Sequence, residues 1–308
     1  MSCTSSIKLS IREEAMRIGF ADCRMAQASS LTGEAPHLTR WIQAEMHGEM
    51  TYMSRHADKR TNPALLVENT RTVISLAVNY APVFRQNPDL PQIAKYAYGA
   101  DYHVVVKEML HRLLTFIRTR HPHTSGRVFT DSAPVLEHAW AARSGLGWTG
   151  KHSLTIHPRY GSYIFLGELL TDLEIEPDPP VADRCGVCSR CMEACPVKAI
   201  VAPRVIDARR CLSYLTIEYK GAFDPRVNLH RRLFGCDICQ DVCPWNKKAV
   251  PHNIRAFEPN RAILEKTAAE WQQLSEAEFN LLTAHSPLQR AGYEAVRRNA
   301  TAICTEFS

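Results

Sequence analysis

The sequence predicts a mixed α/β (α+β) protein in which a cysteine-rich module follows a first domain. Residues 73–80 are apolar, β-branched and uninterrupted, as in a strand that is buried on both faces. Residues 106–117 repeat apolar side chains at helical spacing. The proline-rich run at 176–180 then marks a boundary. We therefore expect a first domain (1–180), a cysteine module (181–250) and a helical C-terminal segment (251–308) that packs on the first domain.

Composition places the chain among ordinary folded proteins. Of its 308 residues 45% are hydrophobic and 22% charged, and no apolar stretch is long enough to cross a bilayer. The first residues lack both the apolar core of a secretory signal and an Arg-Arg pair. Eleven cysteines without a secretory signal favour a reducing compartment. We expect a cytoplasmic protein with no membrane association.

The first domain alternates helical and strand patterns. The expected elements, in order, are a helix over 11–18 closed by Gly19, a helical segment over 41–53, the strand 73–80, a helix through 106–117, a strand over 127–130, a helix from Pro134 to Gly145, and paired strands at 154–156 and 162–170.

Asp131 is the most informative residue outside the cysteines. It follows a strand and precedes a helix, which is where α/β sheets place catalytic groups. An aspartate there can also cap the helix by accepting bonds from its free N–H groups. The residue pattern alone favours the capping role.

The cysteines carry the strongest signal in the sequence. Cys185-Gly-Val-Cys188-Ser-Arg-Cys191-Met-Glu-Ala-Cys195-Pro196 has the spacing by which bacterial ferredoxins hold 4Fe–4S clusters, with the fourth cysteine serving a second cluster. Cys211 and the run Cys236-Asp-Ile-Cys239-Gln-Asp-Val-Cys243-Pro244 form the second half. Crossing the halves assigns Cys185, Cys188, Cys191 and Cys243 to one cluster, and Cys195, Cys211, Cys236 and Cys239 to the other. This predicts a ferredoxin-like module with two 4Fe–4S clusters.

A zinc ribbon or ordinary buried thiols are the alternatives. Zinc sites close on four ligands and favour two Cys-x-x-Cys pairs, which leaves both Cys-Pro endings unexplained. The long gap between Cys211 and Cys236 departs from a plain ferredoxin.

Positive charge gathers on this module. Residues 198–248 contain ten lysines and arginines but five acids, so the excess equals the net charge of +5 of the whole chain. A phosphate-rich partner would meet such a surface, although a merely solvated face fits equally well.

Several stretches together resemble the epoxyqueuosine reductase family, the cobalamin-dependent enzymes that complete queuosine in tRNA. They cover nearly the whole chain and are Tyr52-Met53, Arg60–Pro63, Lys95-Tyr96, Gly99–His103, Asp131–Pro134, Gly145–Lys151, Gly161–Glu168, Cys211–Ile217 and Gly235–Asn246. The Asp-x-His-x-x-Gly signature of histidine-ligated cobalamin is absent, since Asp101-Tyr-His103 lacks the glycine.

The resemblance implies an oxidoreductase acting on CH or CH2 groups, which would reduce epoxyqueuosine to queuosine at the wobble position (34) of tRNAs with GUN anticodons. It implies a base-off cobalamin held between the first domain and the ferredoxin-like module, besides the two 4Fe–4S clusters. Asp131 matches the family's proton donor, a role that would need a raised pKa. With the resemblance, catalysis becomes the favoured role for Asp131.

Further site residues follow by similarity alone. Cobalamin contacts correspond to Arg60, Ala94, Asp131, Thr155, Leu166, Ser213, Cys236 and Asp237, and tRNA contacts to Tyr219 and Lys220. The implied partners are the tRNAs for Tyr, His, Asn and Asp, and an external low-potential electron donor, with the chain acting as a monomer. Some relatives carry a further helical-repeat domain, and we expect this chain to be without one.

Two other functions fit parts of the sequence. A cobalamin-dependent reductive dehalogenase would use the same cofactors, but such enzymes are typically exported with a twin-arginine signal. A non-catalytic iron–sulfur electron-transfer or RNA-binding protein would leave the first domain, with Asp131, without a purpose.

Overall fold

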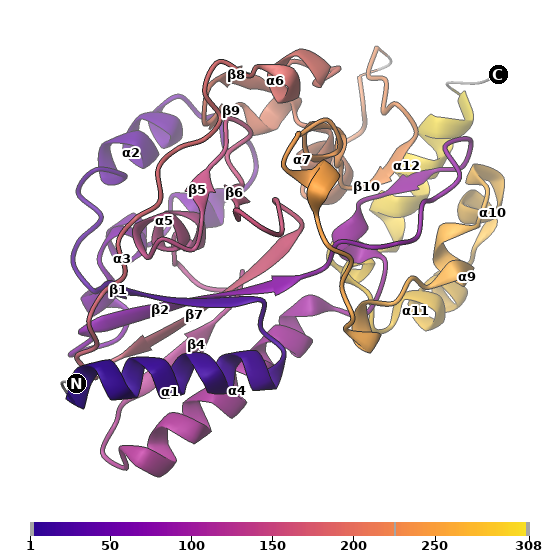
Figure 1. Cartoon of the computed structure of the whole chain (residues 1–308). Helices are drawn as coiled ribbons and strands as arrows, with labels where there is room; N and C mark the ends of the chain where they lie inside the picture. The colour runs from indigo at the N-terminus through magenta and orange to yellow at the C-terminus, as the bar shows by residue number, and fades with distance from the viewer. Residues whose placement is uncertain (1–2, 225, 306–308) are drawn as a thin grey trace.

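A four-stranded antiparallel sheet forms the centre of the first part of the chain in the computed structural model, which describes residues 3–224 and 226–305 (Figure 1). Its strands lie in the order β1 (Asp22–Gln27), β2 (Thr72–Asn79), β7 (Ile164–Thr171) and β4 (Gly126–Phe129). Every residue of β2 and β7 is buried, as their apolar sequences predict. The predicted mixture of helices and sheet is confirmed, although these four strands are all antiparallel.

Helices cover both faces of this sheet. Ile74, Leu76 and Val78 of β2 join the core beneath α1 (Cys3–Ile18) and α4 (Tyr102–Arg120), which lie together on one side of the sheet (Figure 1). The intervening residues of β2 face α5 (Glu137–Arg143) on the other side. This alternation follows from the period of two along a strand.

The strand pairing predicted for 154–156 with 162–170 is wrong. β6 (Thr155–Ile156) pairs instead with β5 (Trp148–Thr149), while β7 runs between β2 and β4. The turn between β6 and β7 is closed by a single backbone bridge between His157 and Gly161, and beyond it the chain enters the central sheet. Two further helices, α2 (Ala35–Gln43) and α3 (Ala57–Thr61), precede β2.

The cysteine module consists of short elements. They are α6 (Arg190–Ala194), β8 (Ile200–Ala202), β9 (Val205–Ile206), α7 (Leu212–Ile217), β10 (Arg232–Phe234) and α8 (Ile238–Asp241). The helices α6 and α8 contact each other, and β10 pairs in parallel with β3 (Gln92–Ile93) of the first part of the chain. That pairing attaches the module to the first domain.

The C-terminal segment is helical, as predicted, with α9 (Arg261–Leu264), α10 (Ala268–Gln273), α11 (Glu276–Thr283) and α12 (Tyr293–Thr305). The sequence placed it on the first domain, but α12 packs against α7 and β10 of the module. One core includes residues of these helices together with Ile93 and Tyr98. The C-terminal segment therefore contacts both the first domain and the cysteine module.

Short 3-10 turns connect these elements. They are η1 (Thr51–Met53), η2 (Pro63–Leu65), η3 (Lys95–Ala97), η4 (Ala208–Arg210), η5 (Asn246–Lys248), η6 (Arg255–Phe257) and η7 (Pro287–Arg290). Within residues 3–224 and 226–305, no helix combines the length and apolar character that a membrane span requires.

We expect Asn299→Ala to destabilise the fold. The buried Asn299 amide donates to the carbonyls of Thr216 (2.8 Å) and Leu233 (2.9 Å), and so joins α12 to α7 and β10. Loss of a donor to buried carbonyls should lower the free energy of unfolding by about 1–3 kcal/mol. Denaturant unfolding followed by circular dichroism measures this. The exposed neighbour Arg297→Ala is the control, and equal stability of the two variants would contradict the assignment.

Candidate functional site

Four thiols line one cavity of about 310 Å³ in the cysteine module. They are Cys185, Cys188 and Cys191, from the loop before α6 and from α6 itself, and Cys243, just after α8. All four are free thiols, and the contact of α6 with α8 brings Cys243 to the other three. The structure thus places in one cavity the four cysteines that the crossed pairing assigns to a single cluster.

The remaining four motif cysteines are also neighbours. Burial raises the pKa of Cys211, and a charge at Cys195 raises it further. Burial raises the pKa of Cys236 to about 12, and a charge at Cys211 contributes to this shift. Burial also raises the pKa of Cys239 well above its ordinary value, and charges at Cys236 and Cys211 contribute. A charge at Cys191 also raises the pKa of Cys239, and the helices α6 and α8 that carry these two residues contact each other. The two sets of thiols therefore adjoin each other.

The chemistry of the eight thiols fits iron–sulfur clusters. A buried thiol with a raised pKa keeps its proton until a metal displaces it, and thiolate sulfur is the usual cluster ligand. Among the described residues, no three His, Cys, Asp or Glu side chains are grouped for a single metal ion. The thiols of the first set are spaced around a cavity instead.

Asp131 lies in a tight turn directly after β4. Its backbone has a left-handed φ of 48°, and its N–H donates to Oε1 of Glu137 at 2.6 Å. The hydroxyl of Tyr102 donates to its carboxylate, and Nε2 of His103 lies 3.8 Å from Oδ2. The Asp131 side chain is 64% exposed. We call Asp131 with Tyr102, His103 and Glu137 the Asp131 site.

Asp131 does not cap the following helix. The sequence predicted a helix from Pro134, but α5 begins at Glu137, and residues 130–134 form a series of bends. Glu137 instead reaches back and accepts a bond from Asp131. The left-handed turn at Asp131 costs a non-glycine residue about 1 kcal/mol or more, and its bonds to Glu137 and Tyr102 offset this cost.

Two further acids lie behind Asp131. Burial raises the pKa of Glu137 to about 8, and the charge of Asp131 adds to this effect. Glu168, in the middle of β7, is completely buried; this burial raises its pKa well above the ordinary value, and Glu137 adds to it. Ser75 donates to Oε2 of Glu168 at 2.7 Å, while Oε1 has no partner. Both acids therefore hold protons near neutral pH.

The residues predicted to contact cobalamin form two groups. On the side of the sheet, Thr155 lies 2.9 Å from Nδ1 of His138, and the Leu166 carbonyl accepts a bond from Thr130 next to Asp131.

On the side of the module, Ala94 donates to the Phe234 carbonyl at 2.8 Å, and Asp237 accepts a bond from the N–H of Lys95 at 2.6 Å. Cys236 lies between Phe234 and Asp237 in the chain, and Ser213 lies on α7. Tyr96 connects the two groups, because its ring lies 6.0 Å from that of Tyr102 and 5.9 Å from that of Phe234.

Arg60 is the predicted contact with the clearest unmet bonding capacity. Its side chain is buried, and Nη2 donates to the Tyr52 carbonyl at 2.8 Å, but Nε has no partner. Burial lowers the pKa of the guanidinium. A buried donor without a partner is costly, and an amide-bearing ligand would satisfy it.

Tyr219 and Lys220, the predicted tRNA contacts, are engaged within the protein. The Tyr219 hydroxyl donates to the Ala222 carbonyl, and Nζ of Lys220 donates to the carbonyls of Ile217 and Ala291. The guanidinium of Arg298 lies over the Tyr219 ring at 5.7 Å.

The sequence did not reveal Arg290 as a site residue. It pairs with Glu218 at 3.0 Å and lies over the ring of Tyr52 at 5.7 Å. The hydrogen bond with Glu218 raises the pKa of Arg290, and the charge of Asp131 adds to this effect. It lies more than 150 positions from Asp131 in the chain, and no local pattern indicates the contact. Glu168 had a visible signal, an acid inside an apolar strand.

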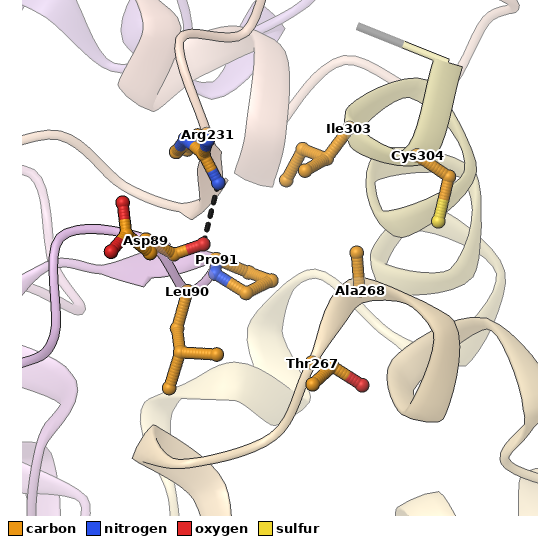
Figure 2. A pocket seen from close by; sticks show the side chains of 8 residues that line it. All are labelled: Asp89, Leu90, Pro91, Arg231, Thr267, Ala268, Ile303 and Cys304. Atoms are coloured by element: carbon orange, nitrogen blue, oxygen red, sulfur yellow. Dashed lines mark hydrogen bonds between the residues drawn. The ribbon is translucent and has the colours of Figure 1, made fainter. Parts of the chain in front are cut away.

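A second cavity, of about 220 Å³, lies between residues 89–91 and the C-terminal helices (Figure 2). Arg231 donates to the Asp89 carbonyl at its edge, and Ile303 and Cys304 of α12 lie across from them. Its lining includes none of the predicted site residues. We assign this cavity no part in catalysis or cofactor binding.

The fold and the two sets of thiols define an iron–sulfur protein in which a double-cluster module joins a mixed α and β domain. The family model of the 4Fe-4S double cluster binding domain matches residues 184–246. The model described as Epoxyqueuosine reductase QueG, DUF1730 matches residues 60–132.

Similar proteins extend the match to nearly the full length. The chain is 44% identical to an epoxyqueuosine reductase of Cellulophaga algicola, over 94% of this chain and 95% of that relative. It is 43% identical to one of Pseudomonas aeruginosa, over 94% and 82% of the two chains. The chain therefore belongs to the epoxyqueuosine reductase family.

Solved structures agree in fold. An epoxyqueuosine reductase with an epoxyqueuosine-modified tRNA-Tyr stem loop has a TM-score of 0.91 at 28% identity, over 99% of this chain and 82% of the other. A Bacillus subtilis epoxyqueuosine reductase, with its catalytic aspartate loop swung out of the active site, has a TM-score of 0.90 at 29% identity over the same shares.

We expect Glu137→Gln to change the pH dependence of stability. The pKa of Glu137 rises from 4.5 to about 8 in the folded protein, so unfolding releases a proton between these values, and stability falls as the pH rises through this window. The variant should remove up to about 1.4 kcal/mol per pH unit from that slope. Denaturant unfolding between about pH 5 and pH 8 tests this. The matched control is Glu108→Gln, on the exposed face of α4, and an unchanged slope in Glu137→Gln would refute the assignment.

Proposed function

We propose that this chain reduces epoxyqueuosine to queuosine at position 34 of tRNAs with GUN anticodons, the last step of queuosine biosynthesis. The observation that carries the proposal is the exposed Asp131 carboxylate, held next to the cysteine module in a chain that is 44% identical to an epoxyqueuosine reductase. Removing the epoxide oxygen consumes two electrons and two protons and yields the alkene and water.

Asp131 would donate one of these protons. Breaking the C–O bond places negative charge on the leaving oxygen, and a positioned acid lowers the barrier by protonating it. Tyr102 holds the carboxylate from one side, while the bond from the Asp131 N–H to Glu137 fixes the turn. Nε2 of His103 lies 3.8 Å from the Asp131 carboxylate, so a proton would return from His103 to Asp131 through one bridging water after turnover.

The cofactors that we propose are two 4Fe–4S clusters and a base-off cobalamin. The two sets of four thiols would hold the clusters, and the residues around the Asp131 site, with Arg60 as a donor, would hold the cobalamin. When bound, these groups supply low-potential electrons at the substrate.

The proposed partners are the tRNAs for Tyr, His, Asn and Asp, and an external low-potential electron donor. Tyr219 and Lys220 would contact RNA through their exposed parts, on the module that carries the positive excess. The substrate base must leave its stack to reach Asp131, as bases in single-stranded loops can. We propose that the protein works in the cytoplasm as a monomer, with domains at 1–180, 181–250 and 251–308.

Deleting the gene, in a strain with no second reductase, tests the proposal. tRNAs with GUN anticodons should accumulate epoxyqueuosine in place of queuosine, measured by mass spectrometry of nucleosides, and the intact gene should restore queuosine. Unchanged nucleoside profiles would refute the function.

We expect Asp131→Asn to retain both cofactors but to lose turnover by at least about 100-fold, since an amide cannot donate the proton. Absorption spectra of the anaerobically purified protein measure the cofactors, and conversion of an epoxyqueuosine-containing stem loop measures activity. Asp89→Asn, in an exposed loop, is the control. Full activity of Asp131→Asn would remove Asp131 from catalysis.

We expect Arg60→Leu to weaken cobalamin binding about tenfold or more, because a charge-assisted hydrogen bond contributes about 1.5–3 kcal/mol. Titration of the purified protein with cobalamin, followed by corrin absorption, measures the affinity. The adjacent, half-buried residue Lys59 offers the matched control Lys59→Leu. Equal affinities in the two variants would exclude Arg60 as a cobalamin contact.

A further inference from the structure

Basic side chains border the cavity that contains Cys185, Cys188, Cys191 and Cys243. Lys151, Arg184, Arg190 and Lys248 line it together with the thiols. Among the described residues, none of the four forms an ion pair. Arg184, Arg190 and Lys248 are exposed, while Nζ of Lys151 donates to the Gly186 carbonyl at 2.7 Å within the cysteine loop. We call these four residues the basic rim.

An apolar side chain projects from the same loop. Val187 is fully exposed (101%), although it lies between two cysteines of the first set. The preceding Gly186 has a left-handed φ of 50°. The surface above the first set of thiols therefore combines a small apolar tip with surrounding positive charge. This composition suits a brief, electrostatically steered protein contact.

The two sets of thiols face different parts of the protein. Cys236 of the second set packs into the core shared with Ile93 and Tyr98. Asp237 next to it accepts a bond from the N–H of Lys95, and the ring of the following Tyr96 lies 6.0 Å from that of Tyr102, which donates to Asp131. The first set opens at the basic rim. The helices α6 and α8, which carry Cys191 and Cys239, contact each other between these two ends. Electrons that enter at the rim can thus pass through the module toward the Asp131 site.

Nucleic acid would also be attracted by positive charge. However, the substrate base has to reach Asp131, where Tyr52 and Arg290 lie, and neither residue lines the cavity at the basic rim. The rim is distinguished by lining the same cavity as the four thiols. Its position therefore favours an electron carrier over RNA.

We propose that the basic rim and Val187 form the docking surface for an acidic one-electron carrier protein. The inference rests on the proposed function, because that reaction requires an external donor. In each encounter the reduced carrier loses one electron and this protein gains it, while no bond forms or breaks. Two such encounters supply the electrons for one epoxide.

The test uses the cluster-loaded protein and a pre-reduced, acidic 2Fe–2S ferredoxin as the probe. Reversing the three exposed rim charges, in Arg184→Glu/Arg190→Glu/Lys248→Glu, should slow electron transfer at least tenfold at low ionic strength, measured by stopped-flow absorption. Binding of the oxidised ferredoxin, measured by calorimetry, should weaken in parallel. The wild-type rate should fall as salt is added.

A control variant makes the same change in net charge elsewhere. Arg85→Glu/Arg112→Glu/Arg255→Glu alters exposed residues away from the rim and should keep wild-type transfer and binding. The extent of reduction by dithionite should be equal in all three proteins, which shows that the clusters are intact. Epoxide reduction driven by dithionite tests the proposed function separately.

Two results would overturn the inference. Electron transfer from ferredoxin at the wild-type rate in the rim variant would show that carriers dock elsewhere. Loss of affinity for an epoxyqueuosine-containing stem loop, with ferredoxin binding unchanged, would assign the rim to RNA.

Discussion

A small buried hydrogen-bond network fixes the cysteine module to the sheet. The relative positions of the first set of thiols and the Asp131 site depend on this network. The amide of Asn246 accepts a bond from the N–H of Ser162 (2.6 Å) and donates to its hydroxyl (2.9 Å), and that hydroxyl donates to Gln240 (2.8 Å). Gly161 has a left-handed φ of 66°, and a Cβ there would lie 2.1 Å from Oδ1 of Asn246. A buried hydrogen-bond network that is only half satisfied is less favourable than an apolar contact. The bonds of Asn246, Ser162 and Gln240 therefore specify one arrangement of these two segments. It joins the chain entering β7 to the turn that carries Cys243.

The same strand connects the network to the proton chemistry. β7 begins just after Ser162, carries the buried Glu168 at its centre and pairs with β4, whose end leads into Asp131. Burial raises the pKa of both Glu168 and Glu137, which keeps two protonated acids behind Asp131 near neutral pH. The strain of a left-handed aspartate is held by its bonds to Glu137 and Tyr102.

Local sequence patterns predicted what depends on local geometry. The cysteine spacing indicated two sets of four thiols, and the uninterrupted run at 73–80 indicated a central strand, because each signal lies within one short segment. The partner of 154–156 was mispredicted because strand pairing is a long-range choice, and β7 pairs with two strands that lie far from it in the chain. The turn at Asp131 and the approach of Arg290 had no local signal, since both depend on contacts between distant segments. Asp131 was favoured for catalysis only through the family resemblance.

The long gap between Cys211 and Cys236 is explained by its packing. Its apolar residues, such as Leu212, Ile217 and Leu233, contact both Ile93 and the C-terminal helices in one core. The buried Asn299 adds bonds to both ends of the gap. A plain ferredoxin would have no such surface and could move relative to its partner domain. The inserted segment instead makes the second set of thiols, the first domain and the tail parts of one packed structure, which keeps that set at a fixed distance from Asp131.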